Sequence, residues 1–151
     1  MAYDITFRLP EGWNSISETY CDESGVEISH LEAHLPSEKD KSDDILIDIY
    51  VGDMPEGETA EDQAFANYAE TVGFDNEDED EDYNPIEKFK FNGKSAWGFR
   101  ALTEENCPMR FIAQEVKSGV LAIIVFWAAG EEMVQPTFEL IEKGLRIKNV
   151  Q

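Results

Sequence analysis

The longest uninterrupted run of apolar positions in the chain is Val120–Trp127. Apolar residues occupy both alternating sets of positions, as they do in a strand that is covered on both faces and lies in the middle of a sheet. These eight residues are too few to cross a bilayer as a helix, which needs about 20. The run therefore predicts the central strand of a soluble core.

Alternating apolar and polar positions predict three strands in the first half of the chain. They are Ile5–Leu9, Val26–Leu35 and Ile45–Val51. A polar loop joins the second to the third, so we expect these two strands to pair antiparallel. Residues 15–24 are polar and leave the choice of element open.

Two segments have the periodicity of amphipathic helices. The first covers residues 60–72, with Thr59 as its N-cap, Asp62 three residues later, and Gly73 just after its end. Its expected buried stripe consists of Phe65, Tyr68, Ala69 and Val72. The second helix covers Glu131–Lys143, has Pro136 in its early turns, and is expected to bury Phe138, Ile141 and Leu145.

The clearest turn signal is Asn92-Gly93, between apolar segments at 86–91 and 94–102. Both residues accept the positive φ angles of a type I′ turn, so a hairpin is predicted here. We expect Phe89 and Phe91 to pair across it with Trp97 and Phe99. With strands at 109–116 and 120–127, the second half becomes a four-stranded meander, and residues 145–148 form an extended tail.

The order of these elements predicts one α+β domain over residues 1–151, in which two main helices pack on a twisted antiparallel sheet. The opening strand ends in Leu-Pro-Glu-Gly-Trp13, the hairpin contains Phe-Asn-Gly-Lys94, and the last helix ends in Ile-Glu-Lys-Gly-Leu-Arg-Ile147. In these features the chain resembles PsbP-like proteins, and within that group a bacterial family of unknown function. That fold is shared with a Ran-binding nuclear-import factor. The resemblance implies a binding or assembly factor, and some bacterial relatives are chaperones for secreted effectors.

Charge is distributed very unevenly along the chain, whose formal net charge is −21. Residues 1–82 contain 25 acids and 3 bases, whereas residues 83–151 contain 8 acids and 9 bases. This excess argues against nucleic acid and against anionic membrane surfaces as partners, because both need clustered Lys and Arg. A basic protein partner fits the charge, and so does a plain role in solubility.

The densest acidic segment is the low-complexity run at 75–82, which we expect to be a solvated loop. A basic partner would contact this run, with two further acids and an exposed tryptophan. The candidate partner-binding residues are Asp75, Glu77, Asp78, Glu79, Asp80, Glu81, Asp82, Asp43, Asp44 and Trp13.

Two places in the sequence contain side chains of the kinds that bind metal ions. His30 and His34 flank Glu32 on one face of a predicted strand, but strand geometry separates them by about 13 Å. Only on a helix would their spacing suit zinc. Asp78, Asp80 and Asp82 have the spacing that opens an EF-hand loop, but Tyr83 stands where that loop needs glycine. We therefore predict no metal and no cofactor.

No recognised catalytic motif is present, and Cys107 has no sequence context that ties it to a histidine. The preferred hypothesis is a non-enzymatic protein-binding or assembly module. The alternative is a small-molecule-binding protein or small enzyme with a pocket between sheet and helix. The start of the chain does not resemble a signal peptide and its two cysteines form no disulfide framework, so we expect a cytoplasmic protein. The sequence indicates no oligomeric state.

Overall fold

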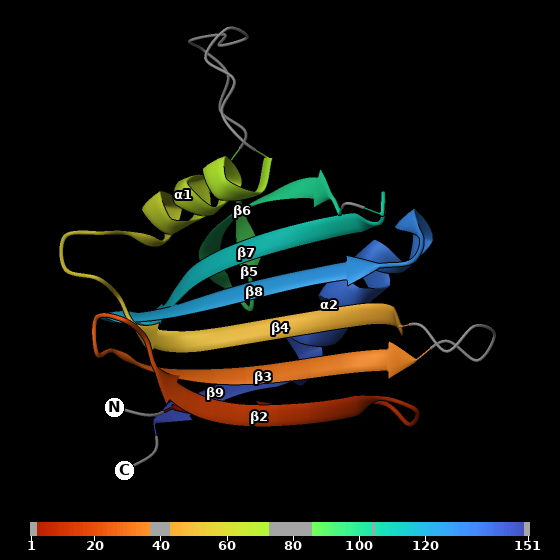
Figure 1. Cartoon of the computed structure of the whole chain (residues 1–151), viewed down its shortest axis with the longest axis horizontal. Helices are drawn as coiled ribbons and strands as arrows, with labels where there is room; N and C mark the ends of the chain where they lie inside the picture. The colour runs from red at the N-terminus through yellow and green to blue at the C-terminus, as the bar shows by residue number, and fades with distance from the viewer. Residues whose placement is uncertain (1–2, 37–42, 73–85, 104, 150–151) are drawn as a thin grey trace, which may run out of the picture.

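A computed structural model describes residues 3–36, 43–72, 86–103 and 105–149 of the chain (Figure 1). The strands are β1 (Tyr3–Phe7), β2 (Asn14–Cys21), β3 (Glu27–Pro36), β4 (Asp43–Asp53), β5 (Glu87–Phe91), β6 (Lys94–Leu102), β7 (Pro108–Lys117), β8 (Val120–Ala128) and β9 (Leu145–Asn149). The helices are α1 (Ala60–Val72) and α2 (Val134–Gly144), the latter preceded by a 3₁₀ turn, η2 (Glu131–Met133). The predicted α+β class, with an antiparallel sheet and two helices, is confirmed.

Strand β8 lies at the centre of a seven-stranded sheet with the order β2-β3-β4-β8-β7-β6-β5. It pairs antiparallel with β4 on one side and with β7 on the other. The prediction of a central strand at 120–127 is therefore confirmed. Strand β2, in the segment for which the sequence left the element open, forms one edge of the sheet and is exposed along its whole length.

Helix α2 and a two-stranded ribbon cover one face of the sheet (Figure 1). The ribbon pairs β1 with β9 from Tyr3 opposite Asn149 to Phe7 opposite Leu145, so the expected extended tail is a paired strand. The predicted stripe of α2 is buried: Phe138, Ile141 and Leu145 all pack into the main core. Alternate residues of β4 and β8 meet them there because side chains alternate across a strand.

A buried arginine connects α2 to the sheet. The Arg110 guanidinium lies 4.8 Å from the ring centroid of Phe89 and 4.2 Å from that of Phe138. Burial lowers the pKa of Arg110, and the nearby charge of Arg100 acts in the same direction. The two aromatic faces partly replace lost hydration, as expected for cation–π contacts.

Helix α1 packs on the opposite face of the sheet, over β6 and β7. Its N-terminus is capped as predicted, because Thr59 N donates to Asp62 Oδ2 at 2.9 Å and Asp62 N donates to Thr59 Oγ1 at 3.2 Å. The predicted buried stripe is wrong at Phe65, which is 45% exposed. The helix instead buries Ala60 and Ala64, whose small side chains allow a close approach to the sheet.

The hairpin at β5 and β6 has the predicted turn, with φ values of 53° at Asn92 and 82° at Gly93. The predicted aromatic pairing across it is wrong. A two-residue turn places Phe91 opposite Lys94, and therefore Phe89 opposite Ala96. Odd-numbered residues of β5 therefore pair with even-numbered residues of β6, and paired residues share a face of the sheet. As a result, Phe89 and Phe91 face the α2 side, whereas Trp97 and Phe99 face the α1 side.

Gly98 permits the close approach of β6 to β7. A Cβ atom added there would lie 1.9 Å from the carbonyl oxygen of Phe111, which is main chain and cannot rotate away. We expect Gly98→Ala to destabilise the fold by about 2 kcal/mol or more in urea unfolding. Arg100→Ala, at an exposed position on the same strand, is the control. Equal midpoints for the two variants would contradict the close approach.

Candidate functional site

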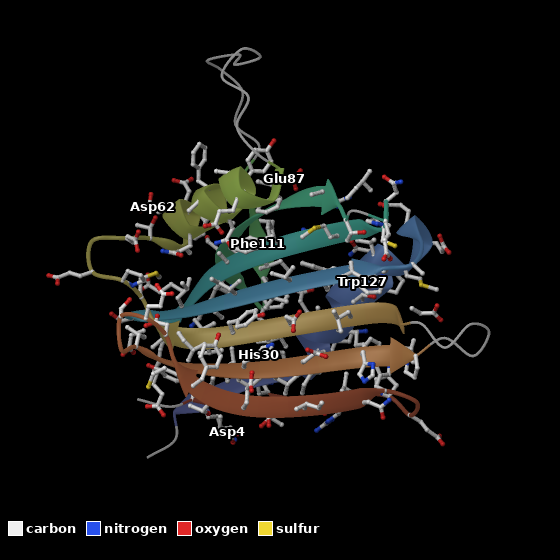
Figure 2. All side chains as sticks on the ribbon, viewed as in Figure 1. Asp4, His30, Asp62, Glu87, Phe111 and Trp127 are labelled. Carbon is white, nitrogen blue, oxygen red and sulfur yellow. The ribbon has the colours of Figure 1, made fainter. Side chains whose placement is uncertain are left out.

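One part of the sheet has no described helix over it. Helix α1 covers β6 and β7, and the same side of β2, β3 and β4 is left open (Figures 1 and 2). We call this surface the open face. Registers of the paired strands assign to it Ile16, Glu18, Tyr20, Ile28, His30, Glu32, His34, Leu46, Asp48, Tyr50, Ile123, Val125 and Trp127.

The open face lies in the acidic half of the sheet. Strands β2, β3 and β4 contain no lysine or arginine. Their acids are Glu18, Glu27, Glu32, Asp43, Asp44, Asp48 and Asp53. In contrast, strands β5, β6 and β7 carry Lys88, Lys90, Lys94, Arg100, Arg110 and Lys117. The charge asymmetry along the chain therefore becomes an asymmetry across the sheet.

Exposed apolar side chains border the acids on the open face. Ile16 of β2 is 68% exposed and Tyr20 of the same strand is 40% exposed. Toward the middle of the sheet, Ile123 and Val125 of β8 are only partly buried, and so is Trp127 near the end of that strand (Figure 2). On this face of β8, Leu121 is buried in the cluster formed with α1, and Ile123 and Val125 pack only partly against that cluster. The predicted coverage of β8 on both faces is therefore incomplete toward Trp127.

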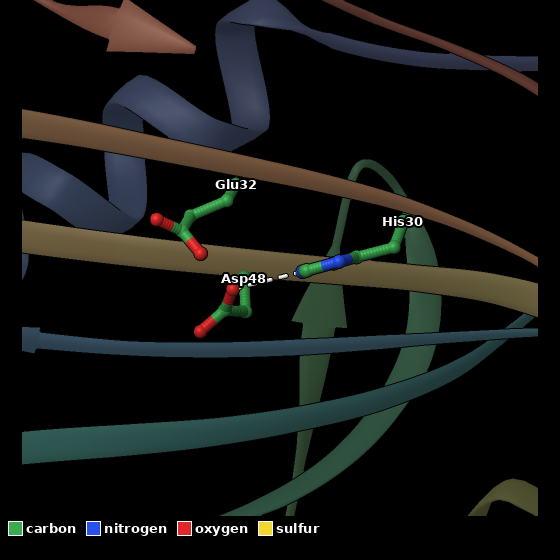
Figure 3. Close-up of side chains that lie close together, drawn as sticks. All are labelled: His30, Glu32 and Asp48. Carbon is green, nitrogen blue, oxygen red and sulfur yellow. Dashed lines mark hydrogen bonds and ion pairs between the residues drawn. The ribbon is translucent and has the colours of Figure 1, made fainter. Parts of the chain in front are cut away.

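His30 is the polar centre of the open face and connects three strands. Its Nδ1 lies 3.2 Å from Glu18 Oε1 on β2. Its Nε2 lies 2.9 Å from Asp48 Oδ1 on β4, as Figure 3 shows. The ring stacks on Tyr50, with centroids 4.4 Å apart and planes within 3°. Glu32, two residues along β3, projects toward the same place and lies opposite Asp48 in the register.

These neighbours alter the ionisation of His30 and Tyr50. Burial alone would lower the pKa of His30, but hydrogen bonds to Asp48 and Glu18 and their negative charges outweigh it, so the pKa is raised. Burial, together with the charge of Asp48 and the other ionisable groups nearby, raises the pKa of Tyr50 to about 12. Protonated His30 is thus a local counter-charge to the two carboxylates that it contacts.

The proposed partner-binding residues are placed as follows. Trp13, expected to be exposed, is half-buried, because it packs against the main core. Asp44, near the start of β4, is partly exposed. Asp43 belongs to the same strand, but its side chain lies outside the described part of the structure. The acidic run at 75–82 also lies outside the described residues, so its role stays a prediction.

The structure replaces the histidine pair with a different group. His30 and His34 both lie on β3, which is a strand as the local pattern indicated. His30 comes together instead with Glu18, Asp48 and Tyr50, none of which the sequence singled out. Alternation alone places Asp48 and Tyr50 on the opposite side from the buried isoleucines of β4. However, the β3–β4 register that brings Asp48 to His30 cannot be deduced from the sequence between the two strands.

A separate cavity of about 370 Å³ lies where β9 passes over the sheet. Ala122 and Ile124 of β8 contribute apolar atoms, and Lys94 and Arg146 contribute charge. Lys94 Nζ donates to Val116 O at 2.6 Å, and Arg146 Nη1 donates to Leu145 O at 2.6 Å. The cavity therefore combines apolar side chains with polar ones, two of them cationic, although the chain as a whole is strongly acidic.

Comparisons of the chain with models of known protein families, with curated proteins and with solved structures gave no match. Among the described residues, neither helix is sufficiently long and apolar to span a membrane.

The ionisation of His30 predicts a pH dependence of stability. Because the folded-state pKa is raised above its ordinary value of 6.5, protonated His30 stabilises the fold. This contribution is fully present below the unfolded pKa and is lost as pH rises through the folded pKa. We expect wild type to lose about 1 kcal/mol relative to His30→Gln between about pH 5.5 and about pH 8.5. Urea unfolding of both proteins in chelator-treated buffer measures it, and parallel pH profiles would contradict it.

Proposed function

We propose that this protein is a non-enzymatic protein-binding or assembly module whose open face receives a basic protein partner. The observation that carries the proposal is an uncovered sheet surface with several acids, in strands that contain no lysine or arginine. Complementary charge accelerates encounter and excludes partners of like charge. Apolar residues beside the acids, such as Ile16 and Tyr20, supply the surface that a specific contact must bury.

The same proposal includes the PsbP-like form of the α+β fold. An antiparallel sheet, the Asn92-Gly93 hairpin and a helix near the end of the described chain support it. The resemblance favours a binding or assembly factor, but fold alone carries little functional information. The function is therefore inferred from the acidic open face, and the fold is consistent with it.

A matched pair of variants tests the basic partner. The first neutralises three acids of the open face: Glu18→Gln, Glu32→Gln and Asp48→Asn. The control neutralises three exposed acids in η2 and α2, namely Glu131→Gln, Glu132→Gln and Glu139→Gln, with the same change in net charge. Each tagged protein is used to capture partners from the native lysate in chelator, at low and at high salt.

We expect the open-face variant to lose the partner that wild type and control retain, with affinity lower by about tenfold. High salt should release the partner from wild type because the contact is electrostatic. Equal retention by the two variants would contradict the proposal. Neutralising residues 75–82 with Asn and Gln in the same assay tests the predicted acidic loop. Ile16→Ser tests the contribution of the apolar side chains beside the acids of the open face.

A second candidate function is favoured by the cavity beneath β9. Apolar walls with Lys94 and Arg146 suit an amphipathic anion, such as a medium-chain carboxylate. In this function the protein would carry or sense a small molecule. The cavity lies between the sheet and strand β9. It differs in construction from the pocket between sheet and helix that the sequence suggested, which stays a prediction.

Titration calorimetry with a medium-chain fatty acid checks the cavity. We expect saturable binding by wild type that Lys94→Gln with Arg146→Gln weakens by about tenfold, because each removed cation costs a charge-assisted contact. Lys90→Gln, an exposed position on the neighbouring strand β5, should leave the affinity unchanged. Absence of saturable binding by wild type would remove this candidate.

A further inference from the structure

Three metal-ligating side chains converge at the centre of the open face (Figure 3). One ligand atom from each of His30, Glu32 and Asp48 can be chosen so that all lie within 4.8 Å of one another. We propose that these three residues bind a divalent transition-metal ion of the zinc type. The site shares Glu32 and Asp48 with the surface proposed for the basic partner, but the proposal does not depend on that partner, because metal binding needs no second protein.

The register of the sheet places the two carboxylates against each other. Glu32 of β3 and Asp48 of β4 are direct cross-strand partners on the same face. Like charges directly opposite one another destabilise a sheet. Strands β2 to β4 provide no lysine or arginine to offset the repulsion, and His30 offsets it only when it is protonated. A bound divalent cation would compensate both carboxylates at a pH where His30 is neutral and can no longer do so.

The side chains around His30 fix the orientation of its ring in the way that is usual for metal-bound histidines. Metal-bound histidines almost always donate the second ring N–H to a carboxylate or a carbonyl group. Here Glu18 Oε1 lies 3.2 Å from Nδ1 and can accept a hydrogen bond from the Nδ1–H group. Nε2 is then unprotonated and directed at Asp48. Stacking on Tyr50 restricts rotation of the ring. The contact from Glu18 is therefore a positioning contact, and Nε2 is the ligand atom.

The donor set indicates the class of ion. One imidazole nitrogen with two carboxylate oxygens suits zinc and its neighbours in the first transition series. Calcium and magnesium prefer sites made only of oxygen. The His30 side chain is 14% exposed and that of Asp48 is 24% exposed, so an ion can enter from solvent. Three protein ligands leave at least one coordination position for water.

His34 provides a matched control on the same strand and face. Four residues of strand separate it from His30 by about 13 Å, which is too far for both to bind one ion. A zinc ion held by general surface acidity would respond equally to loss of either histidine. An ion held at the proposed site would respond to loss of His30 alone.

The test is calorimetric titration of Zn²⁺ into the full chain after removal of metal, with excess Mg²⁺ to occupy unspecific carboxylates. We expect one Zn²⁺ per chain in wild type and in His34→Gln, and an affinity at least about tenfold lower in His30→Gln. Glu18→Ala, which keeps all three ligands and removes the acceptor of the Nδ1–H, should lower the affinity by about tenfold through lost positioning. Equal affinities for wild type and His30→Gln would overturn the proposal.

A measurement on wild type keeps the test independent of whether the variants fold. In ¹H–¹⁵N spectra of the histidine rings, Zn²⁺ should shift the Nε2 signal of His30 and leave the ring signals of His34 in place. Shifts at both rings, or at neither, would overturn the site. Because no partner protein is present, this result is independent of the test of partner binding.

Discussion

The structure depends on a strand that hydrogen-bonds on both sides and carries apolar side chains on both faces. Strand β8 joins β2–β3–β4 to β7–β6–β5, two groups of consecutive strands that are far apart in sequence. One set of its side chains, including Ile124 and Phe126, fills the core under α2, and Leu121 on the opposite side packs with α1. A polar residue inward in this strand would leave an unpaired group within a core, which is costly.

The open face follows from the number of elements available to cover that sheet. Helix α2 and the β1–β9 ribbon together cover one side, whereas the described part of the opposite side has α1 alone. One helix is about 10–12 Å wide, and strands are spaced about 4.8 Å apart, so it covers two or three of them. The acidic strands on the uncovered half are therefore left to solvent or to a partner, and the polar cluster at His30 is formed there.

The sequence predicted the features that depend on local chemistry. Thr59 with Asp62, Asn92 with Gly93, and the apolar run of β8 each specify their element through neighbouring residues, and the structure has all three. Errors arose where two elements had to be aligned. Phe65 satisfies helical periodicity but remains 45% exposed, because the two alanines of α1 allow a closer fit to the sheet.

The candidate site shows the same division between local and long-range information. His30 and Glu32 share a face by simple alternation, so half of the cluster was visible from the sequence. Its other half depends on the β3–β4 register, which includes an irregularity between Leu35 and Pro36. The two-residue turn between β5 and β6 determines which residues of the two strands lie opposite each other. The β3–β4 connection offers no such rule for its register.

The β1–β9 ribbon has a mechanical consequence. Tyr3 and Asn149 are partners at one end of the ribbon, and Phe7 and Leu145 are partners at the other. A force that pulls Tyr3 and Asn149 apart would separate the two strands one residue pair at a time. It would not act on all the hydrogen bonds of the ribbon at once. The ribbon would yield at low force, and its release would uncover α2 and the floor of the cavity while the seven-stranded sheet stayed intact.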